Sequence, residues 1–98
     1  MRYSQSKRIN TENIGKERER PGIYIIQNRN KSDIYIGVSE NIQHRLQALL
    51  YGRADYNQVK KKKKLRRNAS YYRRAYTNIE KARKIENRRK SEMRYNDL

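Results

Sequence analysis

The stretch GIYIIQ at residues 22–27, followed by IYIGV at residues 34–38, decides the fold. Both stretches are rich in β-branched and aromatic residues, which favour strands. The segment NRNKSD between them, at residues 28–33, has the composition of a turn. The two stretches therefore predict an antiparallel β-hairpin with a loop of about five residues.

The hairpin carries two tyrosines that are candidates for a functional pair. Side chains alternate between the faces of a strand, so Tyr24 is opposite in phase to its isoleucine neighbours, and Tyr35 is opposite in phase to Ile34 and Ile36. In a suitable register, both tyrosines share one face of the sheet. A cross-strand aromatic pair that only stabilises the sheet explains this pattern as well as a functional pair does.

Two amphipathic helices are predicted after the hairpin. The first begins at Ser39, a residue type that caps helices, and ends near Gly52. Its isoleucine and leucines recur at helical spacing. The second runs over residues 78–90, and Thr77 and Glu80 have the spacing of a capping box at its start.

The remaining segments are less regular. Residues 60–67, KKKKKLRR, predict an exposed basic helix that begins near Asn57 and turns Leu65 and Val59 inward. Residues 70–76 predict a third strand, although a helix is the competing interpretation. Residues 1–20 are expected to form a flexible basic arm, with a short helix around residues 11–20 as an alternative for part of it, and residues 21–98 the folded domain.

The composition restricts the partners of this chain. Its 98 residues suffice for one domain, and its net charge of +16 favours a polyanionic partner, of which nucleic acid is the most obvious. A basic structural protein has the same charge. The absence of cysteine excludes disulfides and thiolate chemistry. No apolar run approaches the roughly 20 residues that span a membrane, so we expect a soluble, intracellular protein of the cytoplasm or an organelle.

Arg45 and His44 lie on different sides of the first predicted helix. Arg45 is about 40° from Leu49 on a helical wheel, at the border of the apolar stripe. It can reach around the core toward the sheet, or lie in solvent with its stem packed on the core. His44 lies on the exposed face, and this phase argues against a role as a general base.

Glu86 falls inside the apolar stripe of the second helix, whereas Glu80 lies outside it. A carboxylate that faces a core is unfavourable unless it is paired or binds a metal. An ion pair with Arg89 or Lys90 and a metal-binding role therefore both remain open.

The order and spacing of these residues resemble the GIY-YIG nuclease family. The two tripeptides, GIY at 22–24 and YIG at 35–37, stand at the expected separation, and Arg45 follows in the next helix. The stretches ARKIEN at 82–87 and RYN at 94–96 are similar to the C-terminal helix and the closing motif of the family. The likeness covers about residues 21–97.

The resemblance implies an α+β fold, a small three-stranded antiparallel sheet flanked by helices, and hydrolysis of phosphodiester bonds with one Mg²⁺ or Mn²⁺. By the same resemblance, Glu86 is the metal ligand and Asn96 positions Glu86 or the phosphate. Tyr24 activates or orients the attacking water with support from Tyr35. Arg45 stabilises the charge that develops on the phosphate.

One position departs from the family pattern. Many members carry His or Tyr four residues after the catalytic arginine, and here Leu49 stands there. Tyr51, two residues later, is the candidate substitute for proton transfer. Without a substitute, we expect weak activity or a domain that only binds.

Our leading hypothesis from the sequence is a metal-dependent DNA endonuclease, with DNA favoured over RNA, that acts as a monomer or a weak dimer. The alternative is a noncatalytic nucleic-acid-binding protein, ribosome-associated or accessory, that reuses the fold. In both cases a cluster of cations is expected to bind phosphates. These cations are Lys60, Lys61, Lys62, Lys63, Lys64, Arg66 and Arg67.

Overall fold

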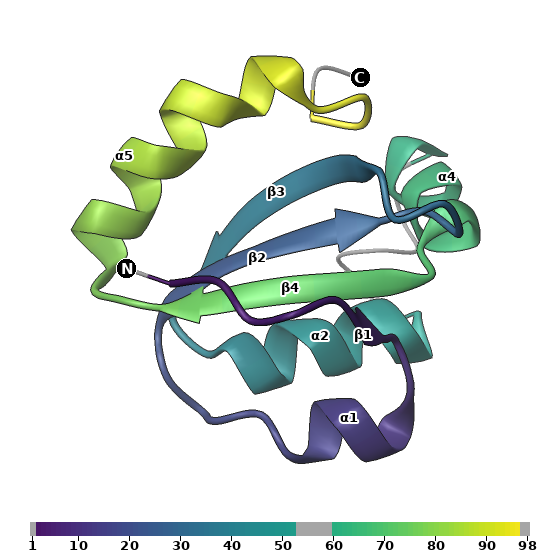
Figure 1. Cartoon of the computed structure of the whole chain (residues 1–98), viewed down its shortest axis with the longest axis horizontal. Helices are drawn as coiled ribbons and strands as arrows, with labels where there is room; N and C mark the ends of the chain where they lie inside the picture. Colours follow the sequence, from purple (N-terminus) through teal and green to yellow (C-terminus); the bar gives the residue numbers. More distant parts are fainter. Residues whose placement is uncertain (1, 53–59, 97–98) are drawn as a thin grey trace.

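The computed structural model describes residues 2–52 and 60–96, and of residues 60–62 it describes the backbone only. Figure 1 shows the chain as strands enclosed by helices. In chain order the elements are β1 (Lys7–Arg8), α1 (Thr11–Gly15), β2 (Gly22–Gln27), β3 (Asp33–Ser39), α2 (Ile42–Tyr51), α4 (Lys60–Asn68), β4 (Tyr71–Tyr76), α5 (Ile79–Arg89) and the 3₁₀ turn η1 (Lys90–Glu92).

The strands form one antiparallel sheet in the order β1-β4-β2-β3. The predicted hairpin is confirmed as β2 and β3, and the third strand is confirmed as β4, so the helical interpretation of that segment was wrong. The α+β fold class is also confirmed. The sheet has four strands and not three, because the N-terminal segment adds β1 beside β4.

The predicted helices form, but both begin at a different cap. Asn41 caps α2, because its side chain accepts a hydrogen bond from the amide of His44, while Ser39 is the last residue of β3. Asn78, and not Thr77, caps α5. Asparagine is as good an N-cap as serine or threonine, and it stands closer to the first helical residue.

Two further expectations concern the end of α2 and the inward side of α4. Gly52 terminates α2 as predicted, with a φ of 66° that suits glycine. In α4 the side chain of Leu65 is buried, as predicted, with 1% of its surface exposed. The expected start at Asn57 and the inward Val59 lie outside the described residues.

Each face of the sheet buries its own apolar cluster. The first cluster joins Tyr24, Ile26 and Tyr72 of the sheet to side chains of α1, α2 and α4. The second joins Ile23, Ile25 and Ile36 to α5 and the segment that follows it. Figure 1 shows α1 and α2 beneath the strands, where the two helices contact each other. In the part of the chain that is described, no helix has the length and apolarity to cross a bilayer.

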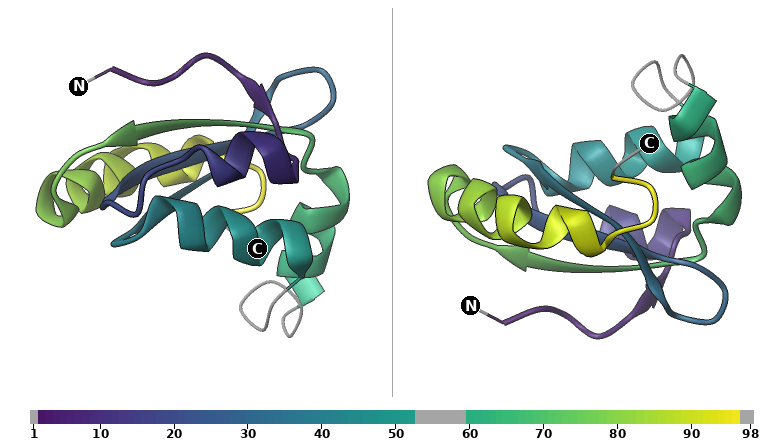
Figure 2. Two further views of the ribbon diagram at one scale, coloured as in Figure 1. Left: turned by 90° about the horizontal axis from the view of Figure 1, so that it is seen from below. Right: turned by 90° about the horizontal axis from the view of Figure 1, so that it is seen from above.

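The N-terminal segment, which the sequence predicted as a flexible arm, takes part in this core. Lys7 and Arg8 pair with Tyr72 and Tyr71 of β4. Ile14 of α1 is buried in the first cluster, with 1% of its surface exposed. The segment is basic overall, yet it carries enough strand-pairing and apolar contacts to pack against the sheet (Figure 2).

A buried carboxylate fixes this segment to β4. Glu17 is 5% exposed and accepts hydrogen bonds from Tyr72 Oη at 2.5 Å, Arg74 Nε at 2.6 Å and Tyr76 Oη at 2.8 Å. Lys7 Nζ lies 3.3 Å from the same carboxylate. Every oxygen of Glu17 therefore has a partner, which is the condition for burying a charge without a large penalty.

The contacts of Glu17 change its acidity and that of its partners. Burial alone raises the pKa of Glu17, but the hydrogen bonds from Tyr72, Arg74 and Tyr76 and the charge of Arg74 outweigh burial and hold its pKa below the usual value. Burial and the neighbouring carboxylate raise the pKa of Tyr72 and of Tyr76. The ionised Glu17 and the neutral tyrosines are therefore the favoured forms.

We expect Glu17→Ala to destabilise the fold by about 3 kcal/mol, because it leaves the hydroxyl of Tyr72 and the guanidinium of Arg74 without their partner. Urea unfolding followed by circular dichroism measures the difference. Glu12→Ala is the matched control, since Glu12 forms only an exposed pair with Lys16. Equal midpoints for the two variants would contradict a structural role for the Glu17 network.

The lowered pKa of Glu17 also predicts how stability depends on pH. Because the folded state prefers ionised Glu17, its contribution is complete above the pKa of an unfolded glutamate, about 4.3, and is lost as the pH falls through the lower folded value. The free energy of unfolding of the wild type and of Glu17→Gln should therefore differ most near neutral pH, and the difference should shrink as the pH falls below about 4.3. A constant difference down to acid pH would show that Glu17 is not the titrating group.

Candidate active site

Tyr24 and Tyr35 share one face of the sheet, as the alternation predicted. Tyr24 pairs with Gly37 and Ile26 pairs with Tyr35, so the two tyrosines are diagonal neighbours. Their ring centroids lie 6.0 Å apart with the planes tilted by 36°. A register shift at the end of β2 turns Ile34 to this same face, so the expectation that Ile34 and Tyr35 are opposite in phase was wrong.

Gly37 makes room for the phenol of Tyr24. A Cβ atom at Gly37 would lie 2.5 Å from both Cζ and Oη of Tyr24, well inside van der Waals contact. With this close approach Tyr24 is 1% exposed, whereas Tyr35 is half-buried. The glycine is therefore required by the side chain across from it, and of the two tyrosines Tyr35 is the one in contact with solvent.

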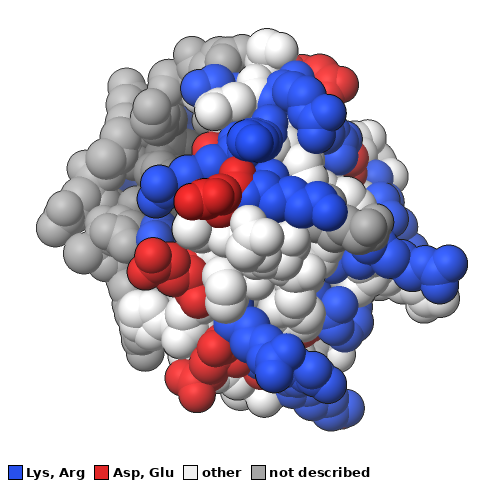
Figure 3. All heavy atoms as spheres, turned by 90° about the vertical axis from the view of Figure 1, so that its left-hand side faces the viewer, with Lys and Arg blue, Asp and Glu red and all other residues white. Residues whose placement is uncertain are grey.

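A hollow of about 450 Å³ lies where β3 ends and α2 begins. Arg45 and His44 of α2 line it together with Ile79 and Arg83 of α5. Arg45 is half-buried, in keeping with its phase at the border of the apolar stripe, and His44 is exposed. Figure 3 looks onto this end of the molecule, where lysine and arginine side chains predominate and acidic side chains lie among them.

Sequence reasoning missed Arg83 as a member of this hollow. The signal was present, because Ile79, Arg83 and Glu86 stand at i, i+4 and i+7 and therefore share one face of α5. Ile79 and Arg83 both line the hollow, so this face of α5 extends from the hollow toward Glu86.

Glu86 is half-buried on α5, which packs against β3. The alternative of an ion pair with Arg89 is not what the structure has, because Arg89 pairs with Asp33 at 3.5 Å and with Glu92 at 3.6 Å. Among the described residues Glu86 forms no ion pair, and Glu80 is exposed. A half-buried carboxylate without a compensating charge is suited to bind a cation.

The donor set of this region suits a magnesium ion with few protein ligands. In the described parts of the chain, no three His, Cys, Asp or Glu side chains gather in a way that could hold a metal by themselves. Magnesium often binds through one or two carboxylates and keeps several waters or phosphate oxygens. Glu86 fits that mode, whereas a tightly caged zinc or calcium ion would need more ligands.

Asn96 holds the chain terminus against the edge strand β3. Its Oδ1 accepts from the amide of Ile36 and its Nδ2 donates to the carbonyl of Ile36, both at 2.8 Å. The amide of Tyr95 donates to the carbonyl of Ile34 at 2.9 Å. The structure thus places Asn96 beside the second tripeptide, and its expected action on Glu86 or on phosphate stays a prediction.

Leu49 and Tyr51 have different surroundings. Leu49 is buried in the first cluster, with 1% of its surface exposed. Tyr51 is 53% exposed, and its hydroxyl lies 3.4 Å from Oγ1 of Thr11 in α1. The hydroxyl of Tyr51 therefore contacts α1.

The expected phosphate-binding cations of α4 have different surroundings. Lys63, Lys64 and Arg67 are exposed, as a binding role requires. Arg66 instead donates to the carbonyls of Leu49 and Leu50 at 2.9 and 3.0 Å, which caps the C-terminal end of α2. The side chains of Lys60, Lys61 and Lys62 lie outside the described residues.

The candidate residues therefore border one strand. Tyr35 and Gly37 belong to β3, Asn96 is bonded to it, and Glu86 is on the helix packed against it. Arg45 lies at the hollow where β3 ends. A sequence model of the GIY-YIG catalytic domain matches residues 20–96.

This chain belongs to the GIY-YIG family.

Solved structures with a similar fold include the GIY-YIG N-terminal endonuclease domain of UvrC from Thermotoga maritima bound to magnesium, its catalytic divalent cation. The TM-score is 0.67 and the identity 26%, over 86% of this chain and 91% of that one. Two point mutants of that domain with a bound divalent cation give a TM-score of 0.67 at 26% and 25% identity, over 86% of this chain and 90% and 91% of theirs. No curated protein gave a significant match.

In this GIY-YIG domain we expect Gly37→Ala to destabilise the fold by about 1–3 kcal/mol, because the new methyl group overlaps the phenol of Tyr24. Urea unfolding measures the loss. Gly15→Ala is the control, since a Cβ there meets no atom within 4 Å, and it should leave the stability unchanged or raise it. If Gly37→Ala is as stable as the wild type, the close approach of Tyr24 to Gly37 is not a constraint in solution.

Proposed function

We propose that this chain is a metal-dependent endonuclease that hydrolyses phosphodiester bonds of DNA. We call the hollow lined by Arg45 and Arg83 the arginine hollow. The observation that carries the proposal is the placement of Glu86, a half-buried carboxylate with no described counter-charge, on the face of α5 that also lines this hollow. The match to the GIY-YIG catalytic domain over residues 20–96 supports the same conclusion.

Glu86 would hold the divalent cation, magnesium or manganese, which would supply charge neutralisation for the phosphate when bound. The UvrC domain with a similar fold carries magnesium as its catalytic cation. A single carboxylate leaves most of the coordination positions of the ion for water and for phosphate oxygens. Metal and substrate would therefore support each other's binding at this surface.

Arg45 and Arg83 would stabilise the negative charge that develops on the phosphate during attack. Both line the hollow at the end of β3, Arg45 from α2 and Arg83 from α5. A guanidinium presents donors in a rigid fork that matches phosphate oxygens. Two arginines on separate helices would contact the phosphate from two sides.

Tyr24 and Tyr35 would orient the attacking water and accept its proton. A tyrosine of ordinary pKa, near 10, needs nearby cations to act as a base at neutral pH. Because Tyr35 is half-buried and Tyr24 is 1% exposed, we assign the first contact with the water to Tyr35 and the supporting role to Tyr24. The family resemblance alone gave the opposite order.

A second candidate function is nucleic-acid binding without cleavage. The observation that favours it is the buried Leu49, which stands where many family members carry a proton-handling side chain. Tyr51, the candidate substitute, is directed toward Thr11. If proton transfer needs a proton-handling side chain at position 49, this domain would bind the nucleic-acid backbone and leave it intact.

Glu86→Gln tests the enzyme directly, because glutamine keeps the size of the side chain and removes its charge. Changing a residue that merely supports a metal ligand costs roughly 10- to 100-fold in activity, so loss of the ligand itself should lower the rate of plasmid nicking in Mg²⁺ by more than about 100-fold. Binding of a labelled duplex in EDTA should stay equal or become tighter, since a negative charge near the phosphates is gone.

Glu80→Gln is the matched control, because Glu80 is an exposed carboxylate on the same helix outside the stripe. It should nick at the wild-type rate. If Glu86→Gln nicks as fast as the control, the proposed ligand is wrong. If the wild type binds DNA but cuts neither with Mg²⁺ nor with Mn²⁺, the noncatalytic function holds instead.

A further inference from the structure

A second basic surface lies at the opposite end of β3 from the arginine hollow. Two hollows, of about 310 and 560 Å³, share Arg67 and Asn68 as lining residues and therefore lie side by side. Arg29 of the β2–β3 loop lines one part, and Lys64 and Arg94 line the other. We call these two hollows together the loop-end groove and define it by its four cations, Arg29, Lys64, Arg67 and Arg94.

The charge of the loop-end groove is not compensated within the described structure. None of the described residues that line it is acidic. Its four cations form no ion pair with described residues, whereas Lys7, Arg74 and Arg89 elsewhere contact carboxylates. Cations that repel one another without a partner favour the binding of a polyanion.

Hydrogen bonds make the walls of the groove rigid. Nδ2 of Asn68 donates to the carbonyl of Lys64 at 2.9 Å and lies 3.0 Å from Oη of Tyr95, which joins α4 to the C-terminal turn. On the other side, Oδ1 of Asn28 accepts from the amides of Asn30 and Ser32 and fixes the loop. A ligand would therefore meet walls that are already ordered, which lowers the entropic cost of binding.

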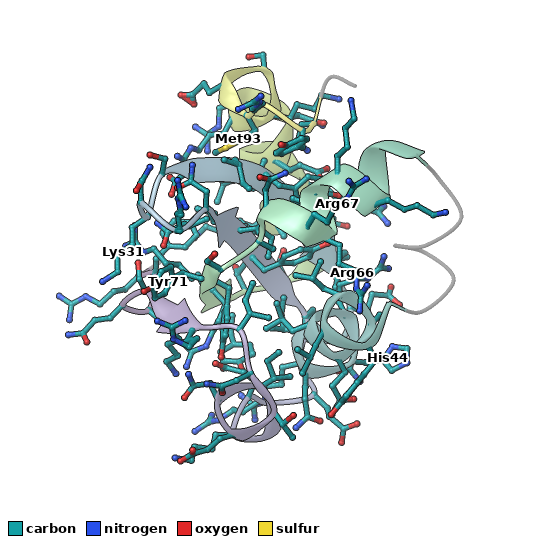
Figure 4. The ribbon with its side chains drawn as sticks, turned by 90° about the vertical axis from the view of Figure 1, so that its right-hand side faces the viewer. Lys31, His44, Arg66, Arg67, Tyr71 and Met93 are labelled. Carbon is teal, nitrogen blue, oxygen red and sulfur yellow. The ribbon has the colours of Figure 1, made fainter. Side chains whose placement is uncertain are left out.

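Neighbouring arginines of α4 have separate tasks. The guanidinium of Arg66 is bonded to the last carbonyls of α2, while Arg67 lies in both parts of the groove. Figure 4 faces this end of the molecule and shows Arg66 toward α2 and Arg67 nearer the C-terminal turn, with Lys31 and Tyr71 on the side of the loop. The basic run of α4 thus supplies both a structural cap and a cation of the groove.

We propose that the loop-end groove binds the phosphates of the nucleic acid at a distance from the bond that is cut. This proposal rests on the proposed function. β3 begins at Asp33 near the groove and ends at Ser39 at the arginine hollow, which is roughly 20 Å for a strand of this length. At 3.4 Å per nucleotide along a duplex, the two sites are about six base pairs apart.

The composition of the groove favours a sugar–phosphate backbone over an acidic protein. Its lining combines cations with asparagine amides and the hydroxyl of Ser70, which are the groups that contact phosphates. A protein partner would require an apolar centre in the interface, and Tyr95, the one large apolar side chain among the described lining residues, is 7% exposed. Such contacts give affinity without sequence preference.

The test removes three charges from the groove by Arg29→Gln, Arg67→Gln and Arg94→Gln in one protein. The matched control removes three from the exposed face of α5 by Lys81→Gln, Lys84→Gln and Arg88→Gln. Binding of a labelled duplex of mixed sequence is measured in EDTA over a range of salt. We expect the groove variant to lower the slope of log K against log salt by about 2–3, at roughly 0.9 per phosphate contact, and the control to lower it by less than about 1.

Circular dichroism establishes that both variants are folded. If the triple variant does not fold, the single variant Arg67→Gln serves as the test, with an expected decrease of about 1 in the slope. Equal weakening by the groove variant and the control would overturn the proposal, because net charge alone would then explain binding. If the groove variant binds like the wild type while Glu86→Gln loses nicking, the groove fails and the proposed function stands. If the wild type never nicks but the groove variant binds weakly, the nuclease fails and the groove stands.

Discussion

The antiparallel pairing of Tyr24 with Gly37 is the constraint on which the rest of this structure depends. A Cβ at position 37 would lie 2.5 Å from the phenol of Tyr24, so glycine strongly favours this register. A slip by one residue would turn every side chain of β3 to the other face. The same register places Tyr35 next to Tyr24 and leaves β3 as the edge against which α5 and the closing Asn96 can pack.

The strand β4, on the other side of β2 from β3, is held by charge instead of by shape. Arg74 of β4 pairs across the sheet with Tyr24, and its guanidinium is fixed by the buried Glu17. Glu17 comes from the N-terminal segment, so the segment that adds β1 also immobilises β4, the strand next to Tyr24 on β2. A buried carboxylate with three strong donors tolerates little displacement, which means that the tyrosines stand on a rigid support even though the domain is small.

Sequence reasoning recovered the elements whose signal is local and missed those that depend on distant partners. The hairpin, β4 and α5 follow from alternation and helical spacing within a few residues, while the phase of Glu86 left an ion pair and a metal role open and only the family resemblance favoured the metal. By contrast, Glu17 binds tyrosines 55 and 59 residues away, and the two residues of β1 have no strand signal of their own. The burial of Tyr24 and the use of Arg66 as a cap are likewise fixed by packing, which a sequence pattern does not contain.

The distribution of charge along β3 gives the large net charge of +16 a spatial meaning. Arg45 and Arg83 lie at one end of this strand, the uncompensated cations Arg29, Arg67 and Arg94 lie at the other, and the carboxylate of Glu86 is on the helix packed against it. A nucleic-acid backbone that is attracted equally by every part of the protein surface would have no preferred position on the protein. Cations at two separated sites would instead define a direction for the nucleic acid, and the metal ion proposed to bind Glu86 would contact the phosphate nearest to that carboxylate. Position along the edge strand, and not the total charge, would then select the bond that is hydrolysed.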